Sequence, residues 1–384
     1  MGRSVHHPEG LIYTSSESYG GYTLFTTNGG DHATLLDVDG NVVHRWHSDE
    51  GIVYAYLIPN GNLLCRTRPP SDVEVVHNLG GSSSALIELD WDGKVVWRYD
   101  DPMLHHDFAR MENGNTLLLL FKELDEETTK KVKGGHITDE DPTRILGDII
   151  REVSPGGDTV NEWDISETLS FDEDLICPLE HRREWTHANC LNLTPEGDFL
   201  ISFRNTSTVG ILSRDTGKFL WKWGPGNVWH QHHPKFLDNG NIQIFDNGSH
   251  SRGADRSRII EVNPSNNEIE WEYTETPAMA FFSFHISSAE RLPNGNTHIC
   301  EGAFGRIFEV TPQGEVVWEY INPFQCPDLR TGDPTNMVFR SHRYSPDHVA
   351  FKGRILDAQN YQTINRMYGG GRTDSASSNR IVVA

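Results

Sequence analysis

The sequence lacks any long apolar run, and this absence bears on its relation to membranes. No stretch of about 18 consecutive apolar residues occurs in the 384 residues, which excludes a transmembrane helix. The first residues, MGRSVHHPEG, have no charged segment followed by an apolar core, so no secretory signal is visible. We therefore expect a soluble chain that does not enter a membrane, for which extracellular action remains plausible.

The sequence also has few basic residues and few cysteines. Lys and Arg number 33 against 55 Asp and Glu, which gives a formal net charge of -22. Such a surface repels a phosphate backbone, so no nucleic acid partner is expected. The five cysteines are odd in number and have no CxxC spacing, which excludes a thiolate zinc knuckle and a fully paired disulfide framework. We expect these cysteines to be small buried hydrophobic residues.

What the sequence does contain is an internal repeat. Six phrases combine an apolar pair, a polar turn and an alternating segment that ends near a tryptophan, at Trp46, Trp97, Trp163, Trp221, Trp271 and Trp318. Successive tryptophans are 51, 66, 58, 50 and 47 residues apart, a spacing typical of propeller blades. Between them lie five turn phrases, at Asn60, Asn113, Glu196, Asn239 and Asn294. Asn-Gly tolerates positive φ on both turn residues, so these phrases predict inner hairpins and four-stranded antiparallel blades.

The number of blades depends on the two ends of the chain. Five blades fit between residues 51 and 320, and the pieces 10–49 and 335–384 must close the ring together. We expect one all-β domain over residues 1–384, a single β-propeller with seven blades in preference to six, and a flexible tail over 368–384. Charged stretches at 122–144 and 166–184 interrupt the repeat and predict loops over one face, either a lid or solvated insertions.

Histidines precede the turns of several predicted inner hairpins. They are His105 and His106 in HHDF, His187 in WTHAN, His230 and His232 in WHQHHP, and His285 in FSFHISS. Counted back from the turn residue, two of them lie seven residues away (His106, His232) and three lie nine away (His187, His230, His285). The even difference predicts that these five share one strand face and converge at one rim of the channel. His105 falls outside this parity and is expected at the exposed mouth.

Arginines near these histidines indicate an anionic ligand. Arg204 in SFR, and Arg340 with His342 in VFRSHRY, offer cations that suit a carboxylate or sulfate; salt bridges to the many acidic residues are the alternative. Histidine clusters also bind zinc or copper, but neither HExxH nor a 2-His-1-carboxylate spacing occurs, so no metal site is expected. We expect no required cofactor, although the acidic loops offer oxygen ligands for a structural Ca²⁺.

These residues resemble those of the arylsulfotransferase-like β-propeller family, over most of the chain. The resemblance rests on HHDF with its Asn-Gly turn, WTHAN followed by SFR, QHHPKFLDNGN followed by FDNG, SSAERLPNGN, and VFRSHRY. Bacterial sulfotransferases of this family use a histidine as the nucleophile that accepts sulfate. The resemblance implies this role for His232 of the Gln231-His232 pair, supported by His106, His187 and Arg204.

Within the same fold group the chain is more similar to fungal rhamnosyl-α-1,4-glucuronate lyases, which trim the rhamnose-capped glucuronate ends of gum arabic and related arabinogalactans. This resemblance implies β-elimination, with His105 or His106 removing the C5 proton of the uronate. Neutralising the neighbouring carboxylate makes that proton acidic, and an imidazole serves first as base and then as acid. The residues expected to bind the substrate are His187, Arg204, His230, His232, His285, Arg340 and His342.

Three classes of function thus remain. The preferred one is a polysaccharide lyase, a carbon–oxygen lyase that acts as a monomer on an acidic carbohydrate. The alternative is an aryl-sulfate sulfotransferase with His232 as the nucleophile. The third, a propeller that only binds partners, predicts no convergent histidines and is disfavoured. Both enzymes need histidines and an anion clamp, so the residue types alone do not separate them.

Overall fold

The computed structural model describes residues 9–136 and 144–368, which are folded almost entirely as β-structure. The described residues form two compact units, one of residues 9–68, 86–98 and 286–368 and the other of residues 69–85, 99–136 and 144–285. Within these ranges the helices are α1 (Glu126–Lys131) and α2 (Gln362–Tyr368), with 3₁₀ turns η1 (Glu74–Val76), η2 (Ile165–Glu167), η3 (Ala278–Ala280), η4 (Gly302–Phe304), η5 (Val349–Phe351) and η6 (Ala358–Tyr361). Neither α-helix has the length and apolar character needed to span a bilayer.

The first unit holds three antiparallel sheets, apart from the end residues of β7 and β8 that belong to the second. One sheet joins β29 (Ser341–Tyr344), β2 (Tyr22–Thr26), β3 (His32–Leu36) and β4 (Val42–His47). Another joins β5 (Tyr54–Leu57), β6 (Leu63–Arg66), β7 (Ala85–Leu89) and β8 (Val95–Asp100). The third joins β23 (Ser288–Arg291), β24 (Thr297–Glu301), β25 (Arg306–Val310), β26 (Val316–Ile321) and, at its edge, β1 (Gly10–Thr14). A short pair is formed by β27 (Cys326–Pro327) and β28 (Pro334–Thr335).

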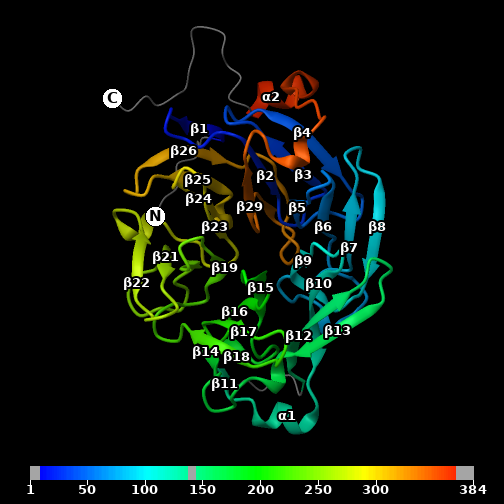
Figure 1. Cartoon of the computed structure of the whole chain (residues 1–384), viewed down its shortest axis with the longest axis vertical. Coiled ribbons are helices and arrows are strands. Elements are labelled where there is room, and N and C mark those ends of the chain that lie inside the picture. Colours follow the sequence, from blue (N-terminus) through cyan, green and yellow to red (C-terminus); the bar gives the residue numbers. More distant parts are fainter. Residues whose placement is uncertain (1–8, 137–143, 369–384) are drawn as a thin grey trace. The chain divides into compact units, whose positions relative to one another are not determined.

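The second unit holds three more antiparallel sheets of four strands. They comprise β9 (Leu104–Arg110), β10 (Thr116–Glu123), β12 (Leu146–Val153) and β13 (Thr159–Asp164); β15 (Ala188–Leu193), β16 (Phe199–Phe203), β17 (Thr208–Leu212) and β18 (Phe219–Trp223); and β19 (His232–Phe236), β20 (Ile242–Asp246), β21 (Arg258–Val262) and β22 (Ile269–Tyr273). The two interruptions of the repeat are not bare loops. They contribute β11 (Gly134–His136) and β14 (Ile176–His181), which pair in parallel near α1 (Figure 1).

These meander sheets are the blades of a β-propeller, and the described residues contain six of them, so the expectation of seven was wrong. The two ends of the chain make one blade instead of two, because β29 pairs directly with β2, shown in orange beside blue in Figure 1. The extra N-terminal strand β1 adds to the edge of an existing blade by pairing with β26. The length attributed to a seventh blade is used by the interruptions and the C-terminal helical turns. The predicted tail over 368–384 lies outside the described residues, except for Tyr368.

The predicted hairpins are present, but their turns differ in one detail. The glycine of each inner turn has positive φ, for example 87° at both Gly61 and Gly114. The preceding asparagines do not, so the turns are not the mirror-image type that the sequence suggested. Instead the asparagine side chain accepts a hydrogen bond two residues along the chain, as Asn60 Oδ1 does from the Asn62 N–H at 2.9 Å. Asn-Gly is favoured here because asparagine closes the turn and glycine adopts the left-handed backbone.

The repeated tryptophans lie on the fourth meander strand of each blade, and several of them link neighbouring outer hairpins. The indole N–H of Trp163 donates to the Arg214 carbonyl at 2.8 Å, and that of Trp46 donates to the Asp90 carbonyl at 3.1 Å. Apolar faces of adjacent sheets pack between these links and form the core. One such cluster in the second unit consists of Leu117, Leu119, Ile150, Ile165, Ala188, Leu191, Phe199, Ile201, Phe203 and Leu212. Stacking of the repeated sheets thus buries both faces of each blade.

Candidate functional site

The histidines of the second unit lie where the first strand of a blade starts or is irregular. Their φ angles are positive: 43° at His106, 52° at His187 and 57° at His230. His187 and His230 precede β15 and β19, and the pairing of β9 with β10 shifts register where His106 lies. The parity argument assumed regular strands at these positions and was wrong in that respect. Non-glycine residues in the left-handed region are strained and cluster at functional sites.

Three imidazoles form a row between two carboxylates. His105 Nε2 lies 3.2 Å from Asp148 Oδ1, and His105 Nδ1 lies 3.0 Å from His106 Nδ1. The His106 ring then meets the His187 ring edge-on, with centroids 4.4 Å apart. At the far end His187 Nδ1 lies 2.8 Å from Glu184 Oε1. The structure thus brings together three of the predicted residues and adds two carboxylates that the sequence analysis did not single out.

His105 is not the exposed mouth residue that the sequence suggested. Its side chain is fully buried and stacks on Phe121 at a centroid distance of 4.0 Å. Its partner Asp148 also accepts hydrogen bonds from the Thr186 hydroxyl and, at 3.1 Å, from the Ala188 N–H. Burial alone would raise the pKa of Asp148, but His105 and these donors outweigh burial and hold the pKa below its usual value. The charged carboxylate therefore orients His105 from within the protein.

The contacts fix one proton of the row. The Asp148 carboxylate only accepts, so His105 carries a proton on Nε2. Between His105 Nδ1 and His106 Nδ1 one nitrogen donates and the other accepts. Glycine backbone holds the His106 ring, since a Cβ at Gly81 would lie 2.2 Å from its Cε1. His106 is thus held in place by His105 and by the Gly81 backbone.

His232 is held in place by a pair of oxygens. Its Nδ1 lies 2.7 Å from Asn247 Oδ1 and 3.1 Å from the His230 carbonyl. The Asn247 amide is oriented because its Nδ2 donates to the Ser283 carbonyl at 2.8 Å. Both neighbours of Nδ1 are acceptors, so the ring proton lies on Nδ1 and Nε2 keeps its lone pair. Burial, together with the charges of Arg204, His187 and His285, holds the pKa of His232 well below its usual value.

Arg204 and His230 meet a further carboxylate, Glu180 on β14. Arg204 NH1 lies 2.7 Å from Glu180 Oε1, and His230 Nδ1 lies 3.2 Å from the same oxygen. Burial lowers the pKa of His230 to about 4, although Glu180 acts in the opposite direction. For Glu180, burial raises the pKa, but His230 and Arg204 hold it well below its usual range. The structure therefore shows Arg204 in an ion pair with Glu180, the alternative that the sequence left open.

The other predicted residues have separate surroundings. His285 stacks on Phe284 at 4.2 Å and acts electrostatically on His232. Arg340 and His342 belong to the first unit. There the Arg340 guanidinium lies 4.9 Å from the Phe339 ring centroid, and His342 lies 2.8 Å from Glu290 and 3.2 Å from the Tyr54 hydroxyl.

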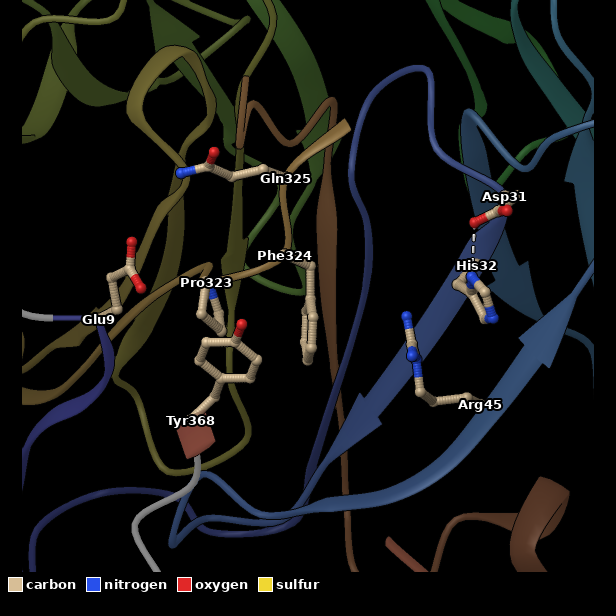
Figure 2. Close-up of a pocket in the computed structure, with 8 residues that line it drawn as sticks. All are labelled: Glu9, Asp31, His32, Arg45, Pro323, Phe324, Gln325 and Tyr368. Carbon is tan, nitrogen blue, oxygen red and sulfur yellow. Dashed lines mark hydrogen bonds and ion pairs between the residues drawn. The ribbon is translucent and has the colours of Figure 1, made fainter. Parts of the chain in front are cut away.

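The first unit also contains an open pocket of about 530 Å³, shown in Figure 2. Its lining residues are Glu9, Asp31, His32, Arg45, Pro323, Phe324, Gln325 and Tyr368. The Arg45 guanidinium lies over the Phe324 ring at 4.8 Å, and the Asp31 carboxylate contacts His32 at 2.5 Å. None of the nine residues predicted from the sequence lines this pocket. It is a separate feature of the first unit.

Several site residues escaped the sequence analysis because they carry no repeat or spacing. Asp148 lies in the apolar strand β12, Asn247 follows β20, and both Glu180 and Glu184 fall in the charged stretch 166–184. The one available signal was that this stretch interrupts the repeat. It does so because β14 is anchored on the neighbouring blade, where the Cys177 N–H donates to the Asn205 carbonyl at 2.8 Å. The stretch therefore supplies site residues.

The comparisons with known proteins concern the family and the fold. A family model described as arylsulfotransferase matches residues 72–323, about two thirds of the chain. No curated protein matches this chain. A solved protein of unknown function from Bacteroides caccae shares the fold, with 15% identity, a TM-score of 0.53, and coverage of 84% of this chain and 98% of that chain.

Two lyase structures are more distant. A streptogramin B lyase is 13% identical with a TM-score of 0.47, and each chain is covered over 82%. The selenomethionine-substituted virginiamycin B lyase from Staphylococcus aureus is 13% identical with a TM-score of 0.41, and each chain is covered over 72%. None of these matches supports the narrower resemblance to the fungal rhamnosyl-glucuronate lyases.

Proposed function

Because the chain belongs to the arylsulfotransferase family, we propose that it is an enzyme that transfers a sulfuryl group from an aryl sulfate to a phenol through His232. From the sequence alone a lyase is the preferred function, and this transfer is the alternative. The family is named for transferases, so the comparisons favour the alternative.

The observation that carries the proposal is the pair of oxygens around His232 Nδ1. They leave the Nε2 lone pair available, and the low pKa keeps the ring neutral at physiological pH. In the first step an Nε2–sulfur bond forms while the sulfur–oxygen bond to the aryl group breaks, and the phenolate leaves with the electron pair. In the second step an acceptor phenol takes the sulfuryl group and Nε2 recovers its lone pair.

Nearby groups support both steps. Arg204 is positive and acts on His232 electrostatically, so it suits the sulfate oxygens. His106, whose ring lies against that of His187, suits the role of base for the acceptor phenol. As Nδ1 of His232 becomes part of a cationic sulfo-imidazolium, Asn247 Oδ1 and the His230 carbonyl stabilise the developing charge.

The test measures phenol release from an aryl sulfate in the presence of a second phenol, with the wild type and three variants. We expect His232→Ala to abolish turnover. We expect Asn247→Leu to reduce kcat by about 10²-fold or more, which is the usual effect of removing one polar group that stabilises charge in the transition state of an enzyme. His44→Ala is the matched control, because burial lowers the pKa of His44 as well, to about 4, but His44 lies on the outer-hairpin strand β4. Normal transfer by His232→Ala would refute the proposal.

A second function is favoured by a different observation, the row of imidazoles between Asp148 and Glu184. Such a row carries protons between a base and an acid, as β-elimination on a uronate requires. Here the buried His105 orients His106, and His106 or His187 reaches the substrate. This revises the sequence-based assignment of His105 as the residue that contacts substrate.

The two functions give different products from the same preparation. Lyase action on the rhamnose-capped glucuronate ends of gum arabic releases rhamnose and forms an unsaturated uronate that absorbs in the ultraviolet. Under the lyase hypothesis His106→Ala abolishes this absorbance. If gum arabic gives no increase in ultraviolet absorbance while an aryl sulfate is turned over, the lyase hypothesis is refuted and the transferase hypothesis is supported.

A further inference from the structure

A cysteine and two histidines come together in the second unit. Cys177 lies on β14, His230 precedes β19, and His250 lies in the segment after β20. One ligand atom from each residue lies within 4.8 Å of those of the other two. Cys177 Sγ is 3.5 Å from His250 Nδ1, and the two imidazole centroids are 4.4 Å apart.

His230 provides a second, independent observation. Its side chain is only 1% exposed, and its Nδ1 faces Glu180 Oε1 at 3.2 Å. Its Nε2 has no hydrogen-bond partner among the described residues. Buried polar atoms are nearly always satisfied, so this nitrogen calls for a missing ligand.

We propose that Cys177, His230 and His250 bind a transition-metal ion of the zinc type. A thiolate and two imidazoles are borderline-soft ligands that suit Zn²⁺ and not Ca²⁺ or Mg²⁺. In a tetrahedral site with Zn–S of about 2.3 Å and Zn–N of about 2.0 Å, the sulfur and nitrogen ligand atoms lie about 3.5 Å apart. The Cys177–His250 separation has this value.

Glu180 stands beside the three ligands. Its Oε1 is 3.2 Å from His230 Nδ1 and 3.8 Å from His250 Nδ1. The same oxygen lies 2.7 Å from Arg204 NH1, so Glu180 is shared with a cation. The fourth coordination position therefore goes to Glu180 or to a solvent molecule. His250 is 31% exposed, which gives the ion a path from solvent.

Metal binding displaces the Cys177 thiol proton. An ordinary cysteine has a pKa of about 8.5, so it is mostly a thiol at neutral pH, and the thiolate is the form that binds a metal. The S–H bond breaks, the sulfur electron pair binds the ion, and the proton passes to solvent. About one proton should be released for each ion bound. None of this depends on the proposed sulfuryl transfer.

The experiment titrates chelator-treated full-length protein with Co²⁺, followed by Zn²⁺ displacement. We expect saturation at about one equivalent, a thiolate-to-cobalt charge-transfer band and the intense visible bands of four-coordinate cobalt. Calorimetry in two buffers of different ionisation enthalpy measures the proton release.

Variants separate this site from adventitious binding. Cys177→Ser should abolish the charge-transfer band, and His250→Ala should weaken affinity more than about 100-fold, since even outer-sphere changes cost up to that factor. Cys326→Ser is the matched control, because Cys326 is also a half-buried free cysteine, and it should bind normally. Circular dichroism verifies that each variant is folded. Absence of the thiolate band in the folded wild type, or equal affinity in wild type and Cys177→Ser, overturns the proposal and indicates adventitious sites such as Asp31, His32 and His47.

Discussion

Replacing His105 by alanine should destabilise the protein, because the buried Asp148 carboxylate loses a contact that offsets its charge. Asp148 is 2% exposed and loses its ion-pair partner at 3.2 Å. Removing one member of a buried pair costs about 3–5 kcal/mol. Asp148 retains its donors from Thr186 and Ala188, so the lower end of this range applies, about 3 kcal/mol at neutral pH. Urea unfolding followed by tryptophan fluorescence measures the loss.

The pH dependence has a definite sign. In the wild type the pKa of Asp148 lies below its unfolded value of 3.8, so its interactions stabilise the fold above that pH and are lost on acidification through the folded pKa. In His105→Ala, burial is opposed only by the remaining donors and raises the pKa of Asp148. The charged carboxylate therefore destabilises the fold of this variant at neutral pH. The difference between the two proteins should therefore shrink below about pH 4, where carboxyl groups become protonated.

Two further variants test this reasoning. Combining His105→Ala with Asp148→Asn removes the uncompensated charge of Asp148. The double variant should therefore have a free energy of unfolding about 1–2 kcal/mol higher than that of His105→Ala alone. His298→Ala is the matched control, because His298 is equally buried but lies 2.8 Å from the Ser341 hydroxyl instead of a carboxylate. A loss below about 1 kcal/mol in His105→Ala, the size of one ordinary hydrogen bond, would refute the argument. So would a double variant no more stable than the single one.

Two smaller predictions concern the position of His106 and the links between blades. Gly81→Ala should reduce kcat for either candidate reaction, because the new Cβ overlaps the His106 ring and Gly81 has a φ of 76°; activity equal to wild type would show that His106 need not hold this position. Trp163→Phe should lower the free energy of unfolding by about 1 kcal/mol, since the Arg214 carbonyl loses its donor. An unchanged urea midpoint would show that this link contributes no stability.

The repeat allowed most of the fold to be predicted from the sequence. Strand alternation, turn glycines and one tryptophan per blade are local signals, and all six tryptophans lie on outer strands of the structure. The errors arose where strands are irregular or where distant segments pair. Positive φ at His187 and His230 breaks the period of two on which the parity argument depended. The pairing of β29 with β2 turned two presumed blades into one.

The sequence by itself determined the class of fold, because hairpin periodicity is a property of short segments. Only the tertiary structure decided which groups act together. Asp148, Glu180, Glu184 and Asn247 have no distinctive spacing, yet they set the tautomers and pKa values of the histidines they face. Cys177, His230 and His250 likewise meet only in three dimensions, since β14 must first pair and dock before its cysteine reaches the other two. Contacts between distant segments depend on packing, and no local pattern encodes them.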